Sequence, residues 1–166
     1  MAKPLKRSVF SKGNKVMPTM GEEAVDRIRR DHEHMLLLID RIRSECTERG
    51  KIDNCNDCGA SRKGVCHGNI EQLIRSFVET TLKHNLIELM FMEDRVPSAH
   101  RLAHNQAHMN IAQQLKAIRV VFSEDGNCVL AIEGIDHIHQ TLLDHFKDYD
   151  QELEAYLVEA ALAPQP

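Results

Sequence analysis

The stretch His84-Asn85-Leu86-Ile87-Glu88 places an imidazole and a carboxylate four residues apart, which is one turn of an α-helix. Both side chains fall on the buried stripe of a longer helical pattern, which consists of Ile70, Leu73, Ile74, Phe77, Thr81, His84, Glu88, Phe91 and Met92. A His and Glu at this spacing are often only a surface contact or a satisfied polar pair in a core. A carboxylate at the centre of a buried face is costly without a partner, however, so the rest of the chain must supply one.

Three other segments show the same helical period. A capping box of Thr19 and Glu22 opens a first helix that is predicted to continue to about Glu48. Asn69 is predicted as the N-cap of the second helix, the one that carries the opening pair.

The third helix is predicted from Ser98 to the turn at residues 123–127, and the fourth from about Cys128 to Ala163. Gly134 inside the fourth costs about 1 kcal/mol relative to Ala. Four long amphipathic helices with mostly short connections predict an all-α, antiparallel up-down-up-down four-helix bundle over residues 19–163.

Composition narrows the class of protein. The chain has 166 residues, one domain's worth, and its 21 Lys and Arg against 25 Asp and Glu give no global electrostatic case for nucleic-acid binding. No apolar run approaches the roughly 18 to 20 residues that span a bilayer, and no signal-peptide core follows the basic start. We therefore expect a cytoplasmic protein with no membrane partner, preceded by a basic flexible tail at residues 1–18.

Histidines converge on the predicted core. The chain has ten, and each of the four helices places at least one on its apolar stripe: His32, His84, His104 with His108, and His145. Imidazole and carboxylate are the ligands that suit iron, manganese or zinc, and facing helices of bundles build two-metal sites. A carboxylate that bridges two cations would remove the cost of burying Glu88.

The combined pattern H…HxxxE…HxxxH…HxxxxD resembles the hemerythrin family, in particular the bacterial hemerythrin-like proteins, over about residues 22–157. The similarity is carried by Asp31-His32 with Met35, Leu36, Ile39 and Ile42, by His84 to Glu88 with Met92, by His104 and His108 with Ile111, and by His145-Phe146 with Asp150 and Leu153. Two positions depart from the family: Thr141 stands where bacterial members usually have Trp, and Leu89 where a second Glu is common.

The resemblance implies two non-haem irons. One would be held by His104, His108 and His145 and the other by His32 and His84, with Glu88, Asp150 and an oxo or hydroxo group as bridges. The second iron would keep an open position for O2 or another small diatomic or anionic ligand. The expected function is reversible O2 binding for sensing, storage or delivery, with no catalytic residue assigned.

Two other functions remain open. The same centre could act as an enzyme on peroxide or nitric oxide, for which an open, polar pocket near His32 and His84 is expected. The chain could also be a regulatory module that contacts a protein partner through its basic tail or its cysteine-rich connection.

Alternative registers also exist for three ligands. His34 could replace His32, but it lies off the apolar stripe. The step from His100 to His104 equals that from His104 to His108, and the step from His139 to Asp144 equals that from His145 to Asp150. The later pair of each is preferred because it fits the stripe or the family pattern better, although Asp150 itself lies away from the centre of its stripe.

A cysteine-rich insertion is predicted at residues 46–68, between the first two helices. Of five cysteines, Cys46, Cys55, Cys58 and Cys66 fall here, and His67 follows directly. In a cytoplasmic chain such a cluster favours metal binding or redox activity over a disulfide framework. Zinc could be held by the four thiols, with His67 as a substitute ligand, or the thiols could respond to oxidation. They could equally be unpaired thiols of a loop. Cys128 is predicted to be an ordinary buried thiol.

Overall fold

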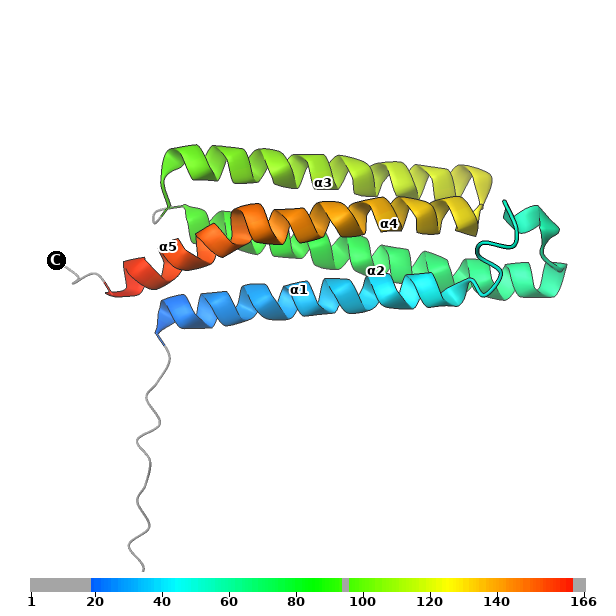
Figure 1. The fold of residues 1–166 in the computed structure, drawn as a ribbon, viewed down its shortest axis with the longest axis horizontal. Helices are drawn as coiled ribbons and strands as arrows, with labels where there is room; N and C mark the ends of the chain where they lie inside the picture. Colours follow the sequence, from blue (N-terminus) through cyan, green and yellow to red (C-terminus); the bar gives the residue numbers. More distant parts are fainter. Residues whose placement is uncertain (1–18, 94–95, 163–166) are drawn as a thin grey trace, which may run out of the picture.

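The computed structural model describes residues 19–93 and 96–162, so the tail predicted at residues 1–18 lies outside the described part. Its named elements are all helical, which confirms the all-α class. They are α1 (Met20–Glu45), the 3₁₀ turn η1 (Cys55–Asp57), α2 (Ala60–Met92), α3 (Ser98–Asp125), α4 (Cys128–His145), the π-helical turn η2 (Phe146–Asp150) and α5 (Gln151–Leu162). The last three follow one another without a break, so the chain forms four long helical segments (Figure 1).

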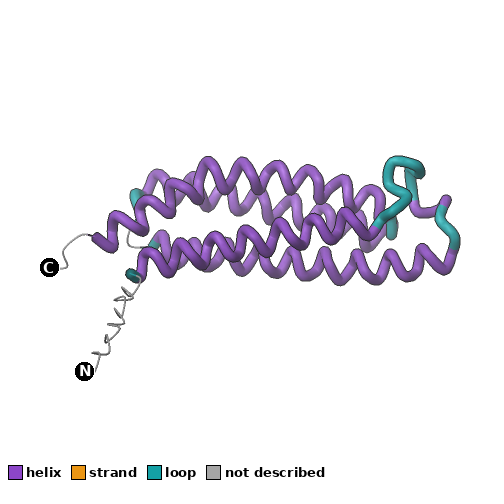
Figure 2. The backbone as a smooth tube through the Cα atoms, turned by 60° about the horizontal axis from the view of Figure 1, so that its bottom comes forward, coloured by secondary structure: helices purple, strands orange, loops and turns teal. Residues whose placement is uncertain are grey.

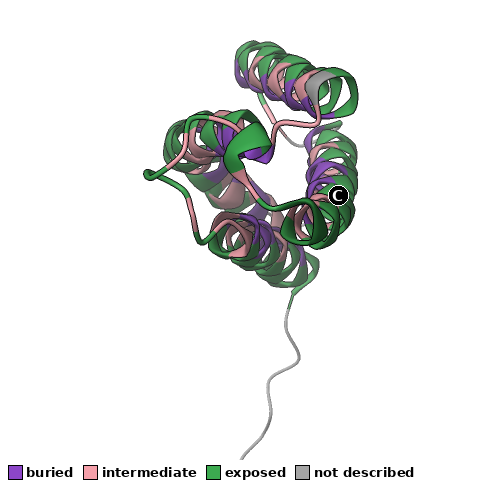
Figure 3. Ribbon diagram, turned by 90° about the vertical axis from the view of Figure 1, so that its right-hand side faces the viewer, coloured by how far each residue is buried: buried purple, intermediate pink, exposed green. Residues whose placement is uncertain are grey.

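The four segments lie lengthwise beside one another (Figures 1 and 2). α1 packs against α2 and α5, and α3 packs against α4. Buried residues face the common axis of the bundle when it is viewed from its end (Figure 3). Among the described residues, no helix is both long and apolar enough to cross a membrane.

The apolar core is divided in two along this axis. A larger cluster includes Met35, Phe77 and Leu142, and a smaller one includes Ile28, Met92 and Leu153. On α1, on α2 and on the last segment, the predicted histidine and carboxylate ligands fall between members of the two clusters. The polar site therefore lies inside the bundle, with apolar packing on either side of it.

The start of α1 follows the sequence prediction. The backbone N–H of Glu22 donates to Thr19 Oγ1 over 3.2 Å, and the backbone N–H of Thr19 donates to the Glu22 carboxylate over 2.7 Å. This reciprocal capping box satisfies two backbone donors at the helix start. The helix ends at Glu45, slightly before the predicted Glu48, because Cys46 adopts an extended backbone.

The prediction for the start of α2 was wrong. The helix begins at Ala60, so residues 60–68 are helical and the irregular connection is shorter than the predicted insertion. Asn69 is not an N-cap, and its amide instead donates to the Glu45 carboxylate over 3.1 Å. Contacts of this early turn with the preceding connection, such as Arg62 with Glu48 at 3.2 Å, favour the helix despite Gly64 and Gly68.

The predicted fourth helix is also not a continuous α-helix. At η2 the backbone N–H of Gln151 donates to the carbonyl of Phe146, five residues back, which adds one residue to that turn. Gly134 in α4 has a packing reason, since a Cβ there would lie 2.8 Å from Cγ1 of Ile118 on α3. The glycine thus lets α3 and α4 approach closely.

Candidate metal site

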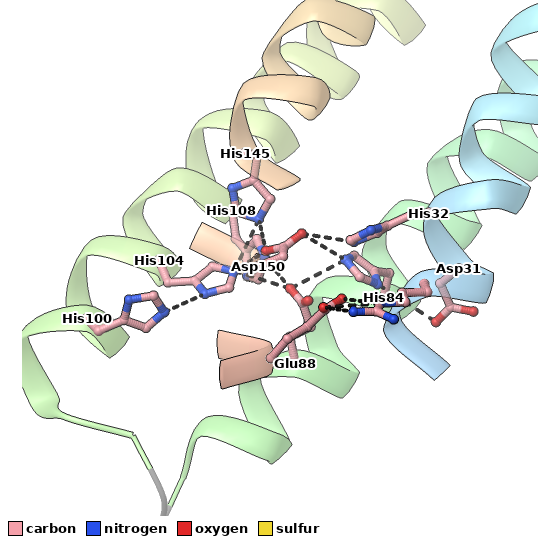
Figure 4. Close-up of polar contacts among 11 residues, drawn as sticks. Asp31, His32, His84, Glu88, His100, His104, His108, His145 and Asp150 are labelled. Carbon is pink, nitrogen blue, oxygen red and sulfur yellow. Dashed lines mark hydrogen bonds and ion pairs between the residues drawn. The ribbon is translucent and has the colours of Figure 1, made fainter. Parts of the chain in front are cut away.

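The structure brings together the seven predicted ligands of the bundle interior (Figure 4). α1 contributes one, α2 two, α3 two and the last segment two: His32, His84, Glu88, His104, His108, His145 and Asp150. All are buried except His32, whose side chain is 13% exposed.

Their ligand atoms form two overlapping groups, each with atoms within 4.8 Å of one another. The first contains three histidines, His104, His108 and His145, and the second contains two, His32 and His84. Glu88 and Asp150 belong to both groups. This buried His, Glu and Asp cluster could hold a metal ion.

Glu88 faces histidines from two helices through one oxygen. Its Oε2 lies 3.2 Å from His104 Nε2, 3.1 Å from His108 Nε2 and 3.4 Å from His84 Nε2. Glu88 is therefore the point where the α2 and α3 ligands meet, as its central place on the α2 stripe led us to expect.

Asp150 contacts the two groups with different oxygens. Oδ1 lies 3.0 Å from His104 Nε2 and 3.1 Å from His145 Nε2. Oδ2 lies 2.9 Å from His32 Nε2 and 3.9 Å from His84 Nε2. The carboxylate thus stands between the three-histidine group and the two-histidine group.

The π-helical turn explains how Asp150 reaches this position. In an α-helix a residue five positions after His145 would be rotated about 140° from it, since each residue advances about 100°. The extra residue of η2 reduces this rotation, so His145 and Asp150 share one face. Sequence periodicity, which assumed a uniform α-helix, placed Asp150 off the stripe for this reason.

Charge is strongly coupled within the cluster. Burial lowers the pKa of His104, but its hydrogen bonds to Asp150 and Glu88 outweigh burial and raise that pKa to about 9. Burial raises the pKa of Glu88, but hydrogen bonds donated by His104 and His108 bring it to about 2. Burial opposes ionisation of Asp150 in the same way, but the rings of four histidines close to its oxygens hold its pKa well below the usual range. Both carboxylates are therefore anionic at neutral pH, and they favour protonated histidines or bound cations beside them.

Several buried polar atoms of the cluster still lack a hydrogen-bond partner of good geometry. They are His32 Nε2, both ring nitrogens of His84, Glu88 Oε1, His145 Nδ1 and both oxygens of Asp150. Unsatisfied buried polar groups are uncommon in folded proteins because each costs about 1–3 kcal/mol. Most of these atoms point into the shared space between the two groups, where cations would satisfy them.

Neighbouring side chains orient the ligand rings. His104 Nδ1 lies 3.3 Å from His100 Nε2, and His100 Nδ1 lies 3.2 Å from the Glu152 carboxylate, so His104 presents Nε2 to the cluster. The His32 ring stacks on Phe146 with centroids 3.7 Å apart. His145 stacks on Tyr149 at 5.3 Å. Sequence reasoning did not identify the roles of these neighbours, because nothing in a single helical pattern shows which rings will stack.

The alternative ligand registers lie outside the cluster. His34 is exposed on α1. His139 contacts the Arg43 guanidinium at 2.9 Å, and Asp144 is exposed and accepts a hydrogen bond from Gln140. His100 is buried but belongs to neither group of ligand atoms.

The side chains at the two positions that depart from the family pattern, Thr141 and Leu89, also point away from the ligand cluster. The Thr141 hydroxyl lies 3.2 Å from Gln114 Oε1 and 3.1 Å from the carbonyl of His137. Leu89 is exposed, so a carboxylate at this position would face away from the bundle axis.

One prediction about the cysteine-rich region needs correction. The His67 ring stacks on Phe122, with centroids 4.4 Å apart, and does not line the cavity that the cysteines share. Cys128 is buried, as predicted, and it also lines that cavity together with the other four cysteines. Sequence spacing missed Cys128 because it lies about 60 residues beyond the cluster and reaches it only through the fold.

Comparisons with known proteins do not assign the chain to a family: no protein-family model, no curated protein and no solved structure matches it.

Proposed function

We propose that this protein is a hemerythrin-like, non-haem di-iron protein that binds O2 reversibly for sensing, storage or delivery. The observation that carries the proposal is the sharing of Glu88 and Asp150 between a three-histidine group and a two-histidine group. Two shared carboxylates within one buried cluster are suited to a pair of cations rather than to a single one.

The unequal groups suggest unequal roles. His104, His108 and His145 would hold one iron, and His32 with His84 would hold the other, with both carboxylates as bridges. The second iron would have one protein ligand fewer and so would keep a position open for a small ligand. Bound iron would supply the electrons for reversible O2 binding.

The chain's own residues would control access to this position. His32 is the most exposed of the seven ligands, and Phe146 covers one face of its ring. Asp31 Oδ2 lies 3.8 Å from His84 Nδ1, on the side of that ring away from Glu88, and is held by Arg27 at 3.0 Å. A small ligand would therefore approach along the α1 side, while the apolar clusters on either side keep bulk water out.

Two further features complete the proposal. We propose an antiparallel up-down-up-down order of the four segments, which the short turns after α2 and α3 support. A cytoplasmic location is supported by the cysteines, because all five are free thiols.

Anaerobic loading with Fe(II), exposure to O2 and return to vacuum test the function. We expect an O2-dependent absorption in the near-ultraviolet and visible that disappears under vacuum and returns with O2. A His32→Ala variant should lose this cycle, whereas the matched His34→Ala variant should keep it because His34 is exposed. Irreversible oxidation of the wild type, or turnover of peroxide or nitric oxide, would favour an enzyme and contradict the binding role.

A further inference from the structure

A second cluster of potential ligands lies at the end of the bundle where α1 meets α2 and α3 meets α4 (Figure 1). All five cysteines line one small cavity there, with a volume of about 20 Å³. They come from different parts of the chain: the end of α1, the connection, α2 and the first residue of α4. A cavity of this size holds about one water-sized sphere, and so a single ion.

Four of the five cysteines contact the main apolar cluster and the fifth does not. Cys55 and Cys128 are buried in the main apolar cluster, and Cys46 and Cys66 pack against it, whereas Cys58 does neither. The Cys128 thiol is in hydrogen-bonding contact with the thiols of Cys55 and Cys66. Cys58 lines the cavity but takes no part in this apolar packing, so it is left out of the ligand set proposed below.

Backbone groups at the cavity would help to stabilise thiolates once a metal has replaced their protons. The backbone N–H of Cys128 donates to Cys55 Sγ over 3.1 Å. Cys128 is the first residue of α4, where the helix dipole stabilises negative charge. Arg62 and Lys63 also line the cavity, as do Glu45 and Glu48, and Arg62 pairs with Glu48 at 3.2 Å.

We propose that Cys46, Cys55, Cys66 and Cys128 form a tetrahedral thiolate site for Zn²⁺, separate from the histidine and carboxylate cluster. Four thiolates are a complete ligand set for structural zinc. Binding would convert four Cys thiols and one Zn²⁺ into a tetrathiolate complex with release of four protons, and no electron transfer is involved.

Metal binding would draw the thiols together. The only ligand groups of the described residues whose atoms lie within 4.8 Å of one another are the two histidine and carboxylate groups, so the four sulfurs must close around the ion. Burial raises the pKa of the Cys66 and Cys128 thiols, which are therefore protonated in the metal-free protein. Zinc would replace these protons, so its binding should weaken as the pH falls.

The site would fasten the connection between α1 and α2 more firmly to the bundle. Residues 46–59 contain the short turn η1 and an isolated bridge between Arg49 and Ile52. A metal shared by Cys46, Cys55, Cys66 and Cys128 would tie this connection to α2 and to the start of α4.

Cobalt substitution of the full chain tests the proposal. Purified, reduced protein is titrated with Co²⁺ under anaerobic conditions, and thiolate-to-cobalt charge-transfer absorption is measured, which nitrogen and oxygen ligands of the other site cannot produce. We expect about one thiolate-bound Co²⁺ per chain, displaced by Zn²⁺. Cys55→Ser and Cys128→Ser should each weaken the signal at least tenfold, while Cys58→Ser and His67→Ala should retain it.

Two results would overturn the proposal. One is a fully reduced, folded protein that gives no thiolate-to-cobalt charge-transfer absorption, since the thiols would then not form a metal site. The other is loss of the signal in Cys58→Ser with retention in Cys128→Ser, which would assign the ligands differently. Helical content measured by circular dichroism for each variant separates loss of ligand from loss of fold.

Discussion

Two buried carboxylates determine the chemistry of the bundle interior. Glu88 and Asp150 are both completely buried, and each contacts histidines of both ligand groups. A buried carboxylate without a counter-charge is costly, so their anionic state depends on imidazolium or metal cations nearby. Substitution of either carboxylate is therefore a direct test of the metal proposal.

Replacing Asp150 should prevent the cluster from holding the two proposed irons together. Asp150→Asn keeps the size of the side chain but weakens both bridging contacts, so bound iron should fall from about two per chain to about one or fewer. Asp144→Asn is the matched control, because Asp144 has the same five-residue spacing from a histidine but is exposed. Bound iron per chain is measured in both variants after anaerobic loading and desalting. Equal iron in the two would show that Asp150 is not a bridge.

The metal-free protein should lose stability at both acidic and alkaline pH. The pKa of Glu88 is depressed from 4.5 to about 2, so its contribution is present above pH 4.5 and is lost as the pH falls toward 2. The pKa of His104 is raised from 6.5 to about 9, so its contribution is present below pH 6.5 and is lost as the pH rises through 9. We expect the thermal midpoint to be highest between these ranges.

Thermal unfolding of the chelated protein at a series of pH values measures this dependence. A His104→Asn variant should show a smaller decline on the alkaline side, because the titrating group is gone. A midpoint that rises between pH 6.5 and 9 in the wild type would contradict the coupling of His104 to the carboxylates.

At the scale of elements, most of the helices could be predicted from the sequence. The periodic stripes and the capping box at Thr19 located α1, because amphipathic period and end signals are local properties. The helix α3 begins at Ser98 as predicted, but its N-cap is Pro97 and no side chain caps it, so Ser98 is not the cap that the sequence suggested. The start of α2 could not be found this way, since Gly64 and Gly68 are locally unfavourable in a helix and contacts with the connection decide the outcome.

For the candidate site, too, local patterns could be predicted from the sequence and contacts between distant segments could not. Its seven residues were identifiable because their spacing follows helical turns and a family pattern. The π-helical turn that orients Asp150 was not, because one added residue in a turn leaves no periodic signal. Cys128 and the stacking of Phe146 on His32 depend on contacts between distant elements, which spacing does not contain.

The helical state of residues 60–68 can be tested with glycine. Gly68 is exposed, and a Cβ there meets nothing within 4 Å, so Gly68→Ala should raise the free energy of unfolding by about 0.5–1 kcal/mol. Urea unfolding of the metal-free protein measures the change. A loss of stability in Gly68→Ala would indicate that this segment is not helical.

Gly21 provides the opposite case. A Cβ at this position would clash with the Leu157 carbonyl oxygen, so α1 and α5 must move apart to accept it. Gly21→Ala should therefore lower the free energy of unfolding by about 1–3 kcal/mol despite its better helix propensity. Unfolding in urea under the conditions used for Gly68→Ala provides the comparison, and an increase in stability would mean that the two helices are not packed this closely.

At the scale of the whole molecule, the polar cluster joins all four helical segments at one level of the bundle. With ligands from every segment, the proposed metal binding would be coupled to folding, because ions would bind the assembled bundle and not the unfolded chain. Metal should therefore act as a cross-link between the two apolar clusters that flank it.

The most direct test of the central claim is anaerobic titration of the chelated protein with ⁵⁷Fe(II), followed by metal analysis and Mössbauer spectroscopy before and after exposure to O2. A shared-carboxylate centre predicts saturation at about two irons per chain and a magnetically coupled diferric signal after oxidation. Saturation at a single iron, or a protein that takes up only zinc and shows no oxygen-dependent absorption, would contradict it.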